Sequence, residues 1–215
     1  MPSADQRTAV LETLRVSRET EADLDRFVAV LLTWQGTTNL IAPSTIPDIW
    51  TRHILDSAQL LPLLGDARHI VDLGSGAGFP GIVLALLLKN RVGVQVHLVE
   101  SNGRKASFLR EAIRETRAPA EVRHDRIETF TARFTNTVDV VTARALAPLS
   151  KLLELSRPLL SRGAVGLFQK GRGAEQELTD SRKSWRIDAE LIPSVTDPSA
   201  RIIMVRAADR LGPRA

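Results

Sequence analysis

The stretch VDLGSGAGFPG, residues 71–81, decides the fold of this chain, because an apolar strand runs directly into a turn with four glycines in eight residues. A tight connection between a strand and a helix needs one such glycine, so four of them indicate a turn that approaches a ligand. Two patterns overlap here. Residues 76–81 match G-x-G-x-x-G, which holds the pyrophosphate of a dinucleotide. Residues 72–78 match D-x-G-x-G-x-G, which wraps the methionine end of S-adenosylmethionine.

Apolar stretches of strand length alternate with helical patterns from residue 69 onward. The expected strands cover 69–74, 94–100, 120–124, 138–143 and 164–170, and the expected helices cover 80–89, 102–117, 149–160 and 173–184. This alternation is typical of a doubly wound, mostly parallel α/β sheet with helices on both faces. Two adjacent strands, 185–193 and 201–207, are expected to form a hairpin and to add one antiparallel edge strand.

Residues 1–64 show no strand signal. Thr20 and Asp23 resemble a capping box, and the apolar residues after them are spaced three and four apart, as in an amphipathic helix. Ser44 is placed to cap a second helix. We therefore predict an N-terminal helical cap over 1–64 and one compact α/β domain over 65–215.

The composition excludes several kinds of chemistry. The chain has 215 residues with no cysteine and no tyrosine, so disulfides, cysteine-bound metals, thiol nucleophiles and a tyrosine acid are absent. Its formal charge of +4 comes from 29 basic and 25 acidic residues, a mild excess that favours a polyanionic partner. The longest apolar run, residues 82–88, is too short for a membrane span, and the amino terminus does not resemble a signal peptide. We expect a cytoplasmic protein with no metal and no membrane partner.

Further residues favour S-adenosylmethionine over a dinucleotide. Glu100 ends the second expected strand, where a carboxylate accepts hydrogen bonds from the ribose hydroxyls of either ligand. Asp72 would repel a pyrophosphate but can meet a bound amino group, and Phe79 crowds the space that a dinucleotide turn leaves open. Gly76 and Gly78 let the backbone approach the cofactor. No second substrate domain follows, so a nicotinamide-dependent oxidoreductase is the alternative that ranks second.

The acceptor of the methyl group is narrowed by what the chain lacks. Methylation of cytosine C5 and radical methylation generally need cysteines, and the chain has none. Methylation of an exocyclic amine typically uses an Asn/Asp-Pro-Pro-aromatic tetrad after the fourth strand, where this sequence reads TARALAPL (142–149). Guanine N7 has a free lone pair and needs neither cysteines nor this tetrad, so it remains as the acceptor. Ribose O2′ and protein acceptors are excluded less firmly than cytosine C5 and exocyclic amines. For N7 we expect alignment of the reactants and no catalytic base.

Six segments carry a resemblance to one family. They are WTRHILDSAQL (50–60), DLGSGAGFPGI (72–82), LVESNGRKASFLRE (98–111), RIETF (126–130), TARALAPL (142–149) and FQKGR (168–172). In this order they resemble the RsmG (GidB) family of bacterial small-subunit ribosomal RNA guanine-N7 methyltransferases. The likeness runs from about Trp34 to Arg172, and RHILDS joined to GSGAGFPGI is far more specific than a glycine turn alone.

The resemblance implies a Rossmann-like S-adenosylmethionine-dependent methyltransferase fold, with S-adenosyl-L-methionine as the cofactor. It implies a cofactor pocket with Gly74 and Phe79 in the turn, Ile127 and Glu128 in the loop after the third strand beside the adenine, and Arg144 after the fourth strand. The implied reaction methylates a guanine, position 527 of the small-subunit ribosomal RNA, in the bare RNA or in an assembling small subunit. A non-catalytic ribosome-assembly factor is the alternative outside the enzymes.

Basic residues near the carboxyl ends of the strands are the candidates for RNA binding. They are Arg123, Arg126, Arg144, Lys170 and Arg172. Cations at this edge can grip RNA phosphates, and we select Arg144, Lys170 and Arg172, with the first two preferred. The arginines within 102–117 alternate with glutamates, as on a solvated helix face. We expect the protein to be a monomer.

The segment RHILDS, residues 52–57, places His53 on one helix face with Asp56 or Ser57. A metal site needs more ligands than this face offers. We therefore expect a hydrogen-bonded helix face that packs against the glycine turn. His53 is also the one residue of this region whose ordinary pKa would let it act as a base near neutral pH.

Overall fold

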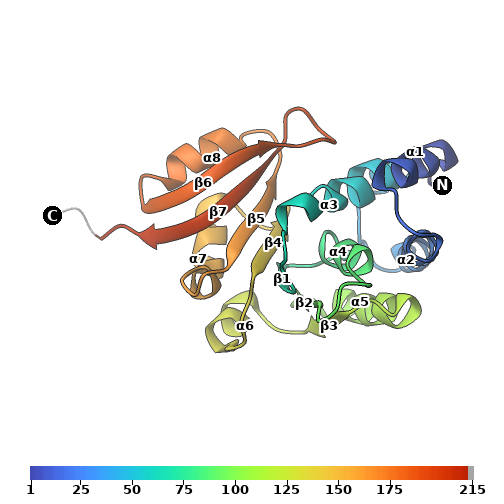
Figure 1. Cartoon of the computed structure of the whole chain (residues 1–215), viewed down its shortest axis with the longest axis horizontal. Helices are drawn as coiled ribbons and strands as arrows, with labels where there is room; N and C mark the ends of the chain where they lie inside the picture. The colour runs from blue at the N-terminus through green and yellow to red at the C-terminus, as the bar shows by residue number, and fades with distance from the viewer. Residues whose placement is uncertain (213–215) are drawn as a thin grey trace.

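The computed structural model describes residues 1–212, and its centre is a seven-stranded sheet with the strand order β3-β2-β1-β4-β5-β7-β6. The strands are β1 (His69–Leu73), β2 (Gln95–Val99), β3 (Ala120–Arg123), β4 (Val140–Arg144), β5 (Val165–Lys170), β6 (Trp185–Pro193) and β7 (Arg201–Arg210). Strands β1 to β5 pair in parallel, and β7 pairs antiparallel with both β5 and β6. The expectation of a doubly wound, mostly parallel α/β sheet is confirmed (Figure 1).

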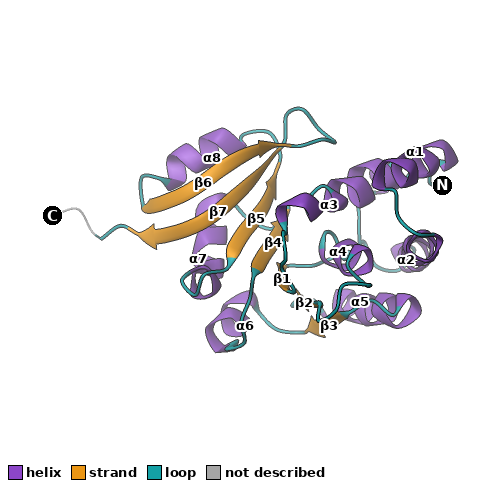
Figure 2. Cartoon of the chain, viewed as in Figure 1, coloured by secondary structure: helices purple, strands orange, loops and turns teal. Residues whose placement is uncertain are grey.

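Helices cover both faces of the sheet (Figure 2). On one face lie α4 (Gly81–Leu87) and α5 (Gly103–Thr116), and on the other lie α6 (Ile127–Arg133), α7 (Leu149–Leu160) and α8 (Ala174–Ser181). Except for α6, each of these helices falls within a range expected from the sequence. Because both faces are covered, β1 and β2 are buried on both sides, which explains their nearly continuous apolar sequences. Within residues 1–212, no helix has both the length and the apolar character needed to cross a membrane.

The carboxy-terminal hairpin differs from the expectation. Strands β6 and β7 do form an antiparallel hairpin, but the strand that runs against the others is β7, which lies inside the sheet between β5 and β6. The edge strand is β6, and it runs in the same direction as β5. The connection through α8 carries the chain past one strand position, and the hairpin then brings β7 back into that position. The buried side chains of Ile202, Ile203 and Val205 suit this internal place.

The N-terminal cap consists of α1 (Ala4–Leu14), α2 (Arg18–Gln35) and a run of short helical turns. The expected capping box at Thr20 is wrong, because α2 begins earlier. Ser17 is the N-cap residue, and its hydroxyl accepts a hydrogen bond from the Thr20 N–H at 3.3 Å. Asp23 therefore lies inside the helix, where its carboxylate is free to pair with other elements.

The expected helix after Ser44 is broken into shorter pieces. The chain forms a 3₁₀ turn at Pro43–Thr45, a π-helix at Trp50–Leu55, one α turn as α3 (Asp56–Ala58), and a 3₁₀ turn at Leu61–Leu63. A π-helix is wider than an α-helix and is frequent at functional sites. Here it carries most of the RHILDS segment.

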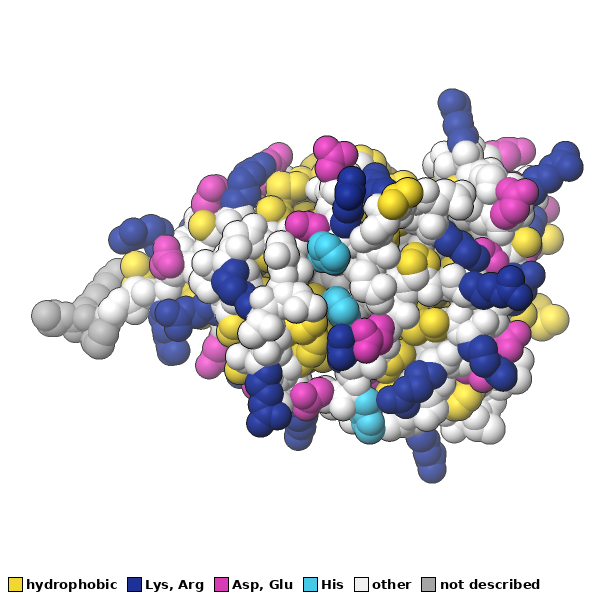
Figure 3. Space-filling view, turned by 60° about the horizontal axis from the view of Figure 1, so that its bottom comes forward, with side chains coloured by type: hydrophobic (Ala, Val, Ile, Leu, Met, Phe, Trp, Pro, Cys, Tyr) yellow, Lys and Arg dark blue, Asp and Glu magenta, His cyan; other side chains and the backbone are white. Residues whose placement is uncertain are grey.

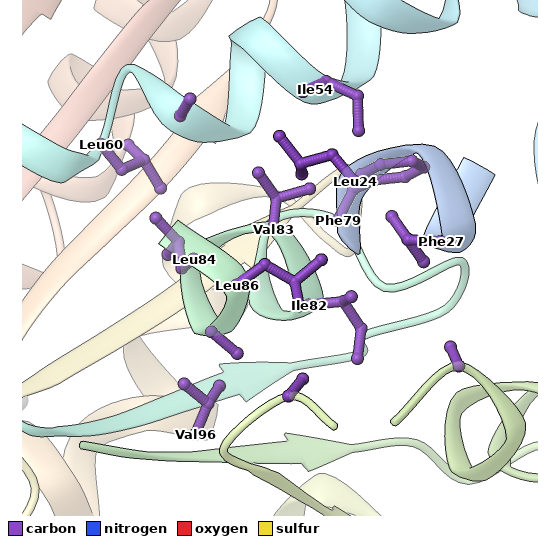
Figure 4. Close-up of a cluster of buried hydrophobic side chains, with 14 of the residues drawn as sticks. Leu24, Phe27, Ile54, Leu60, Phe79, Ile82, Val83, Leu84, Leu86 and Val96 are labelled. Carbon is purple, nitrogen blue, oxygen red and sulfur yellow. The ribbon is translucent and has the colours of Figure 1, made fainter. Parts of the chain in front are cut away.

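The cap and the sheet share one hydrophobic cluster (Figure 4). Phe27 of α2 is fully buried and packs with Phe79 of the glycine turn and Ile82 of α4. Burial of an aromatic side chain of this kind contributes ~1.5–3 kcal/mol. The cluster is continuous across residue 64 and does not mark a boundary there. The division into a helical cap over 1–64 and one compact domain over 65–215 stays a prediction.

Candidate active site

The glycine turn lies at the carboxyl edge of the sheet, where β1 and β4 are neighbours. From β1 the chain continues to β2 on one side, and from β4 it continues to β5 on the other, so the strand order reverses at this point. Open α/β sheets bind ligands at such a reversal, in the crevice beyond the carboxyl ends of the strands. The place of the turn in the fold is therefore that of a ligand site.

Three glycines of the turn hold the left-handed backbone conformation. The φ angles of Gly74, Gly76 and Gly78 are 68°, 53° and 84°. A side chain is strained in this region, which explains why glycine is used at all three positions. The N–H groups of Gly74 and Ser75 both donate to the Val99 carbonyl oxygen, at 2.9 and 3.1 Å, and so tie the turn to the end of β2.

The glycines form two pairs that differ in their surroundings. Gly78 and Gly81 are buried: a Cβ atom on Gly78 would lie 2.8 Å from Ile82 Cγ1, and one on Gly81 would collide with a leucine of β2. Gly78 thus packs against α4, and the expectation that it lets the backbone approach the cofactor stays a prediction. Gly74 and Gly76 are both half-buried. A Cβ atom on Gly76 would make only an ordinary contact, whereas one on Gly74 would lie 2.6 Å from Leu146 Cδ1. The turn is therefore open beside Gly76, and the end of the Leu146 side chain covers Gly74.

Glu100, directly after β2, is buried beside the turn. Its Oε2 accepts a hydrogen bond from the Gly76 N–H at 2.9 Å, and its Oε1 accepts one from the Asn102 N–H at 2.7 Å. The carboxylate thus holds the turn and the start of α5 together, a role that the sequence pattern does not reveal. Each carboxylate oxygen has a second lone pair, so Glu100 retains acceptor capacity for a ribose hydroxyl.

Asp72 does not meet the expectation that it faces a bound amino group. Its side chain lies beneath Gly81 of α4, is 1% exposed, and accepts a hydrogen bond from the Thr142 hydroxyl at 2.8 Å. Burial raises the pKa of Asp72 to about 6, although its hydrogen bonds act in the opposite direction. Side chains of a strand point alternately to the two faces of the sheet. The Asp72 side chain points to the face that α4 covers, so it lies in the core and away from the ligand edge.

Phe79 joins the turn to the RHILDS segment. Its ring stacks on His53, with ring centroids 4.9 Å apart and 19° between the planes. The guanidinium carbon of Arg144 lies 5.2 Å from the centroid of the same ring. Phe27 of the cap meets the ring edge-on, at 5.3 Å between centroids. The expected packing of RHILDS against the glycine turn is confirmed.

His53 is a neutral side chain with both ring nitrogens in use. Arg144 Nη2 lies 2.8 Å from His53 Nδ1, and since an arginine only donates, Nδ1 must accept. The proton is then on Nε2, which lies 2.9 Å from the Thr45 hydroxyl. Burial, followed by the charges of Arg144 and Arg52, lowers the pKa of His53 to about 3. His53 therefore positions Arg144 and has no free nitrogen for proton transfer.

Asp56 connects four segments of the chain. Its Oδ2 accepts hydrogen bonds from Arg144 Nη1 at 3.2 Å and Gln169 Nε2 at 2.8 Å. Its Oδ1 accepts from Gln59 Nε2 at 2.7 Å and from the Thr196 hydroxyl at 2.8 Å. The RHILDS segment, β4, β5 and the β6–β7 loop thus meet on one carboxylate. Sequence reasoning did not find Gln169 and Thr196, because they lie 113 and 140 residues along the chain from Asp56.

Two of the three cations selected for RNA binding are engaged inside the protein. Arg144, the last residue of β4, pairs with Asp56 at 3.2 Å and its side chain is 19% exposed. Lys170 pairs with Glu177 at 2.8 Å, and its side chain is 12% exposed. Arg172 is exposed, and among residues 1–212 it forms no salt bridge. Of the three, only Arg172 is presented to solvent without a partner in the described part of the chain.

Ile127 and Glu128 lie in a helix and not in a loop, which corrects the expectation. They are the first two residues of α6, with Arg126 as the N-cap residue. The seven residues of α6 are too few to show a helical period, so sequence reasoning missed this helix. Ile127 is half-buried and Glu128 is exposed, and both follow β3 at the ligand edge of the sheet.

A pocket of about 530 Å³ opens beside Arg144. Its walls are the RHILDS segment, the ends of β4 and β5, and the β6–β7 loop, which contributes Thr196 and Asp197. The volume lies within the range of ~300–1,000 Å³ that is usual for ligand sites. Within residues 1–212 there is no group of three or more His, Cys, Asp or Glu residues that could hold a metal ion. The ligand edge therefore carries two features, the glycine turn and this polar pocket, and Arg144 links them because it lines the pocket and lies over the Phe79 ring of the turn.

Solved structures with this fold include methyltransferases. An O-methyltransferase from Bacillus cereus in complex with SAH aligns with a TM-score of 0.58 and 16% identity, over 93% of this chain and 96% of that one. A SAM-dependent methyltransferase from Aquifex aeolicus aligns with a TM-score of 0.55 and 16% identity, over 78% of this chain and all of that one (100%). At such identities the likeness concerns the fold alone, which is that of the Rossmann-like S-adenosylmethionine-dependent methyltransferases.

Sequence comparison gives the family. The profile of the family described as rRNA small subunit methyltransferase G (GidB) matches residues 20–203. Relatives named ribosomal RNA small subunit methyltransferase G include one from a Bradyrhizobium species, 52% identical over 96% of this chain and 93% of the relative. Another, from Methylorubrum extorquens, is 50% identical over 98% of this chain and 100% of the relative. The chain belongs to the rRNA small subunit methyltransferase G family, and the resemblance seen in its motifs is confirmed.

Proposed function

We propose that this chain transfers a methyl group from S-adenosyl-L-methionine to N7 of a guanine in small-subunit ribosomal RNA. The observation that carries the proposal is the glycine turn at the strand reversal, in a chain of the rRNA small subunit methyltransferase G family. The open position at Gly76, backed by Glu100, suits an amino-acid tail joined to a ribose. Membership in a methyltransferase family speaks against a nicotinamide-dependent oxidoreductase.

The residues that we propose for the cofactor site come from the carboxyl ends of four neighbouring strands. They are Gly74, Gly76, Gly78, Phe79, Glu100, Ile127, Glu128 and Arg144. Gly74 and Gly76 would face the methionine part, Glu100 would accept hydrogen bonds from the ribose, and the start of α6 would flank the adenine. Phe79 and Arg144 support the cleft from behind, since the Phe79 ring is buried and Arg144 stacks on it.

The reaction at N7 needs alignment and no base. S-Adenosyl-L-methionine supplies a methyl group on a positively charged sulfur. Guanine N7 has an in-plane lone pair and carries no proton at neutral pH, so no proton leaves the attacked atom. The protein's contribution is to hold nitrogen, methyl carbon and sulfur in line. The neutral His53, with both nitrogens hydrogen-bonded, is consistent with a site that has no general base.

Transfer of labelled methyl groups tests the proposed reaction. Purified protein is incubated with labelled cofactor and with either bare small-subunit ribosomal RNA or assembled small subunits. We expect N7-methylguanine in one of these substrates, at a single position when the product is mapped. An absence of label in both substrates would contradict the proposal and would favour a non-catalytic assembly factor.

A matched pair of glycine variants tests the cofactor cleft. Gly76→Ala and Gly65→Ala introduce the same side chain at φ angles of 53° and 52°, so the two variants carry similar backbone strain. The Cβ atom on Gly65 would have nothing within 4 Å, and Gly65 precedes β1 at the opposite edge of the sheet. We expect only Gly76→Ala to weaken cofactor binding in calorimetry, by about tenfold. Equal affinities of the two variants would remove Gly76 from the site.

We also propose that the protein acts as a monomer in the cytoplasm. One chain supplies the glycine turn, the helices behind it and the walls of the polar pocket, so no second copy is needed to complete either site. Sedimentation equilibrium of the purified protein should give the mass of one chain. A concentration-independent dimer would contradict this part of the proposal.

A further inference from the structure

The loop between β6 and β7, residues 194–200, brings a carboxylate to two arginines at the mouth of the polar pocket. Asp197 and Arg52 line the same pocket, and Arg172 directly follows residues of its wall. Hydrogen bonds from Ser199, together with the charges of Arg52 and Arg172, lower the pKa of Asp197. The Asp197 carboxylate is therefore influenced by the charges of both guanidinium groups, although in residues 1–212 it forms no salt bridge with either of them.

The loop is fixed in this place by polar contacts on both sides of the aspartate. The Thr196 hydroxyl donates to Asp56 Oδ1 at 2.8 Å, and the Val195 N–H donates to Gln59 Oε1 at 2.9 Å. At the other end of the loop, Arg201 Nη1 donates to two loop carbonyl oxygens, each at 2.8 Å. These contacts hold the loop, and with it Asp197, in a fixed position between the RHILDS segment and the pocket.

The two arginines differ from the other cations of the pocket. Arg52 and Arg172 are exposed, and within residues 1–212 neither forms a salt bridge. Arg144 and Lys170 are instead paired with internal carboxylates. On the face shown in Figure 3, Lys and Arg side chains lie among Asp and Glu side chains rather than in one continuous basic field. On this face no broad basic patch marks an RNA-binding surface, so single unpaired cations such as Arg52 and Arg172 are the candidates.

We propose that Arg52 and Arg172 clamp one phosphate of the RNA strand whose acceptor base enters the polar pocket, and that the Asp197 carboxylate, which lines the same pocket as Arg52, competes with this phosphate for the two arginines. The inference rests on the proposed function. Guanine N7 of an RNA helix lies in the deep, narrow major groove, which side chains cannot reach, so an unstacked base is the better substrate. Holding such a base requires a pocket and a grip on the adjoining backbone. The forked guanidinium group suits the oxygens of a phosphate. A backbone phosphate and the Asp197 carboxylate each carry one negative charge, so the two groups repel each other at this mouth. The carboxylate also reduces binding of unrelated polyanions.

Removal of each arginine tests the clamp. Arg52→Ala and Arg172→Ala are compared with Arg210→Ala, an exposed arginine at the end of β7 and at the opposite edge of the sheet. Binding of a short single-stranded RNA is measured over a series of salt concentrations. We expect the two clamp variants to bind about two- to fivefold more weakly, as for other exposed ion pairs. We also expect each to lower the salt slope by ~0.7, and Arg210→Ala to leave it unchanged.

Asp197→Asn gives the sharper test, because it is expected to improve binding. Asparagine keeps an oxygen to accept the hydrogen bonds from Ser199, but it removes the competing charge. We expect the variant to bind the same RNA about two- to fivefold more tightly. Asp209→Asn, which removes an exposed charge at the opposite edge, is the matched control. A merely structural role for Asp197 would weaken RNA binding or leave it unaltered, and either result would contradict the proposed competition between Asp197 and the phosphate.

Two further measurements distinguish a failure of the phosphate clamp from a failure of the proposed function. Cofactor affinity by calorimetry shows that each variant is folded, since none of these side chains contacts the glycine turn. Suppose that the Arg52 and Arg172 variants bind RNA as tightly as Arg210→Ala, and that the unaltered protein transfers methyl groups. The clamp is then contradicted and the proposed function stands. An absence of methyl transfer by the unaltered protein would reject the proposed function instead.

Discussion

The two halves of the ligand edge are held together by different forces. The half at β1 and β2 is built by packing, with Phe27 and Phe79 buried and Gly78 fitted against α4. The half at β4, β5 and the β6–β7 loop is built by hydrogen bonds that converge on Asp56 and Arg144. We propose that the packed half gives the cofactor a rigid frame, whereas the contacts of the polar half can be exchanged for those of an entering RNA.

The largest expected effect concerns the packed half. Phe27 is fully buried and meets Phe79 and Phe108 at ring distances of 5.3 and 6.4 Å. Phe27→Ala should lower the free energy of unfolding by ~3–5 kcal/mol, because the lost contacts and the cavity both cost stability. Urea unfolding measures the change, and Phe27→Leu, which fills more of the space, should lose less. Equal, small losses in both variants would show that the cap does not support the turn.

The polar half should respond less strongly. Asp56→Ala leaves Arg144 and Gln169 without their acceptor, and we expect a loss of ~2–3 kcal/mol in the free energy of unfolding. This is below the usual cost of breaking a fully buried pair, because the Arg144 and Asp56 side chains are 19% and 18% exposed. Asp180→Ala removes an exposed partner of Lys183 and is the control, with little change expected. Indistinguishable unfolding curves for the two variants would contradict the central role of Asp56.

Glu100 tests whether the cofactor is bound at the boundary of β1 and β2. A carboxylate that accepts hydrogen bonds contributes ~1.5–3 kcal/mol, so Glu100→Ala should weaken cofactor affinity by about one to two decades. Glu100→Gln keeps one acceptor oxygen and should weaken it less. Calorimetry gives both dissociation constants. An unchanged constant in the alanine variant would take Glu100 out of the cofactor site.

The free energy of unfolding at acid pH depends on two buried groups, His53 and Asp72, one from each half. His53, with a pKa of about 3 in the fold, takes up a proton on unfolding, so its contribution is present above its ordinary pKa of 6.5 and lost as the pH falls toward 3. Asp72 has the opposite sign: its pKa is about 6 in the fold against 3.8 ordinarily, so it stabilises the fold as the pH falls below 6. The two slopes oppose each other between about pH 4 and 6.

Asp72→Asn removes one of these slopes. Unfolding free energies measured from about pH 6 to pH 4 should then fall by ~1.4 kcal/mol per pH unit more steeply than in the unaltered protein. His53→Gln is the complementary variant and should show the reverse change. If the variants and the unaltered protein share one pH profile, neither group is titrating as its burial indicates.

The smallest expected effect is on the pH dependence of the chemical step. Since His53 stays neutral, the single-turnover rate of methyl transfer should be nearly constant from about pH 6 to 9. Rapid-quench measurements at saturating cofactor and RNA give this profile. A steep acidic limb that disappears in His53→Gln, with both affinities unaltered, would show that a base acts after all.

Local patterns predicted most of the fold and little of the polar half. The helix at Leu149–Leu160 and the strands that frame the glycine turn follow apolar periods, which any buried element imposes on its own sequence. The place of β7, by contrast, depends on pairing between distant strands, and α6 is too short to show a period. Arg144 and Lys170 were chosen as RNA ligands because they are basic and stand at the right edge. Their internal partners come from segments that no local pattern links to them.

The internal place of β7 also has a consequence for the order in which the two halves form. A chain is synthesised from its amino terminus, so β1 to β5 and the glycine turn leave the ribosome before β6 and β7. Until β7 enters its position, one edge of β5 is unpaired and the loop that carries Thr196 has not reached Asp56. On the sites proposed here, a nascent chain therefore completes its cofactor site first, and it completes its RNA site only with the last strand.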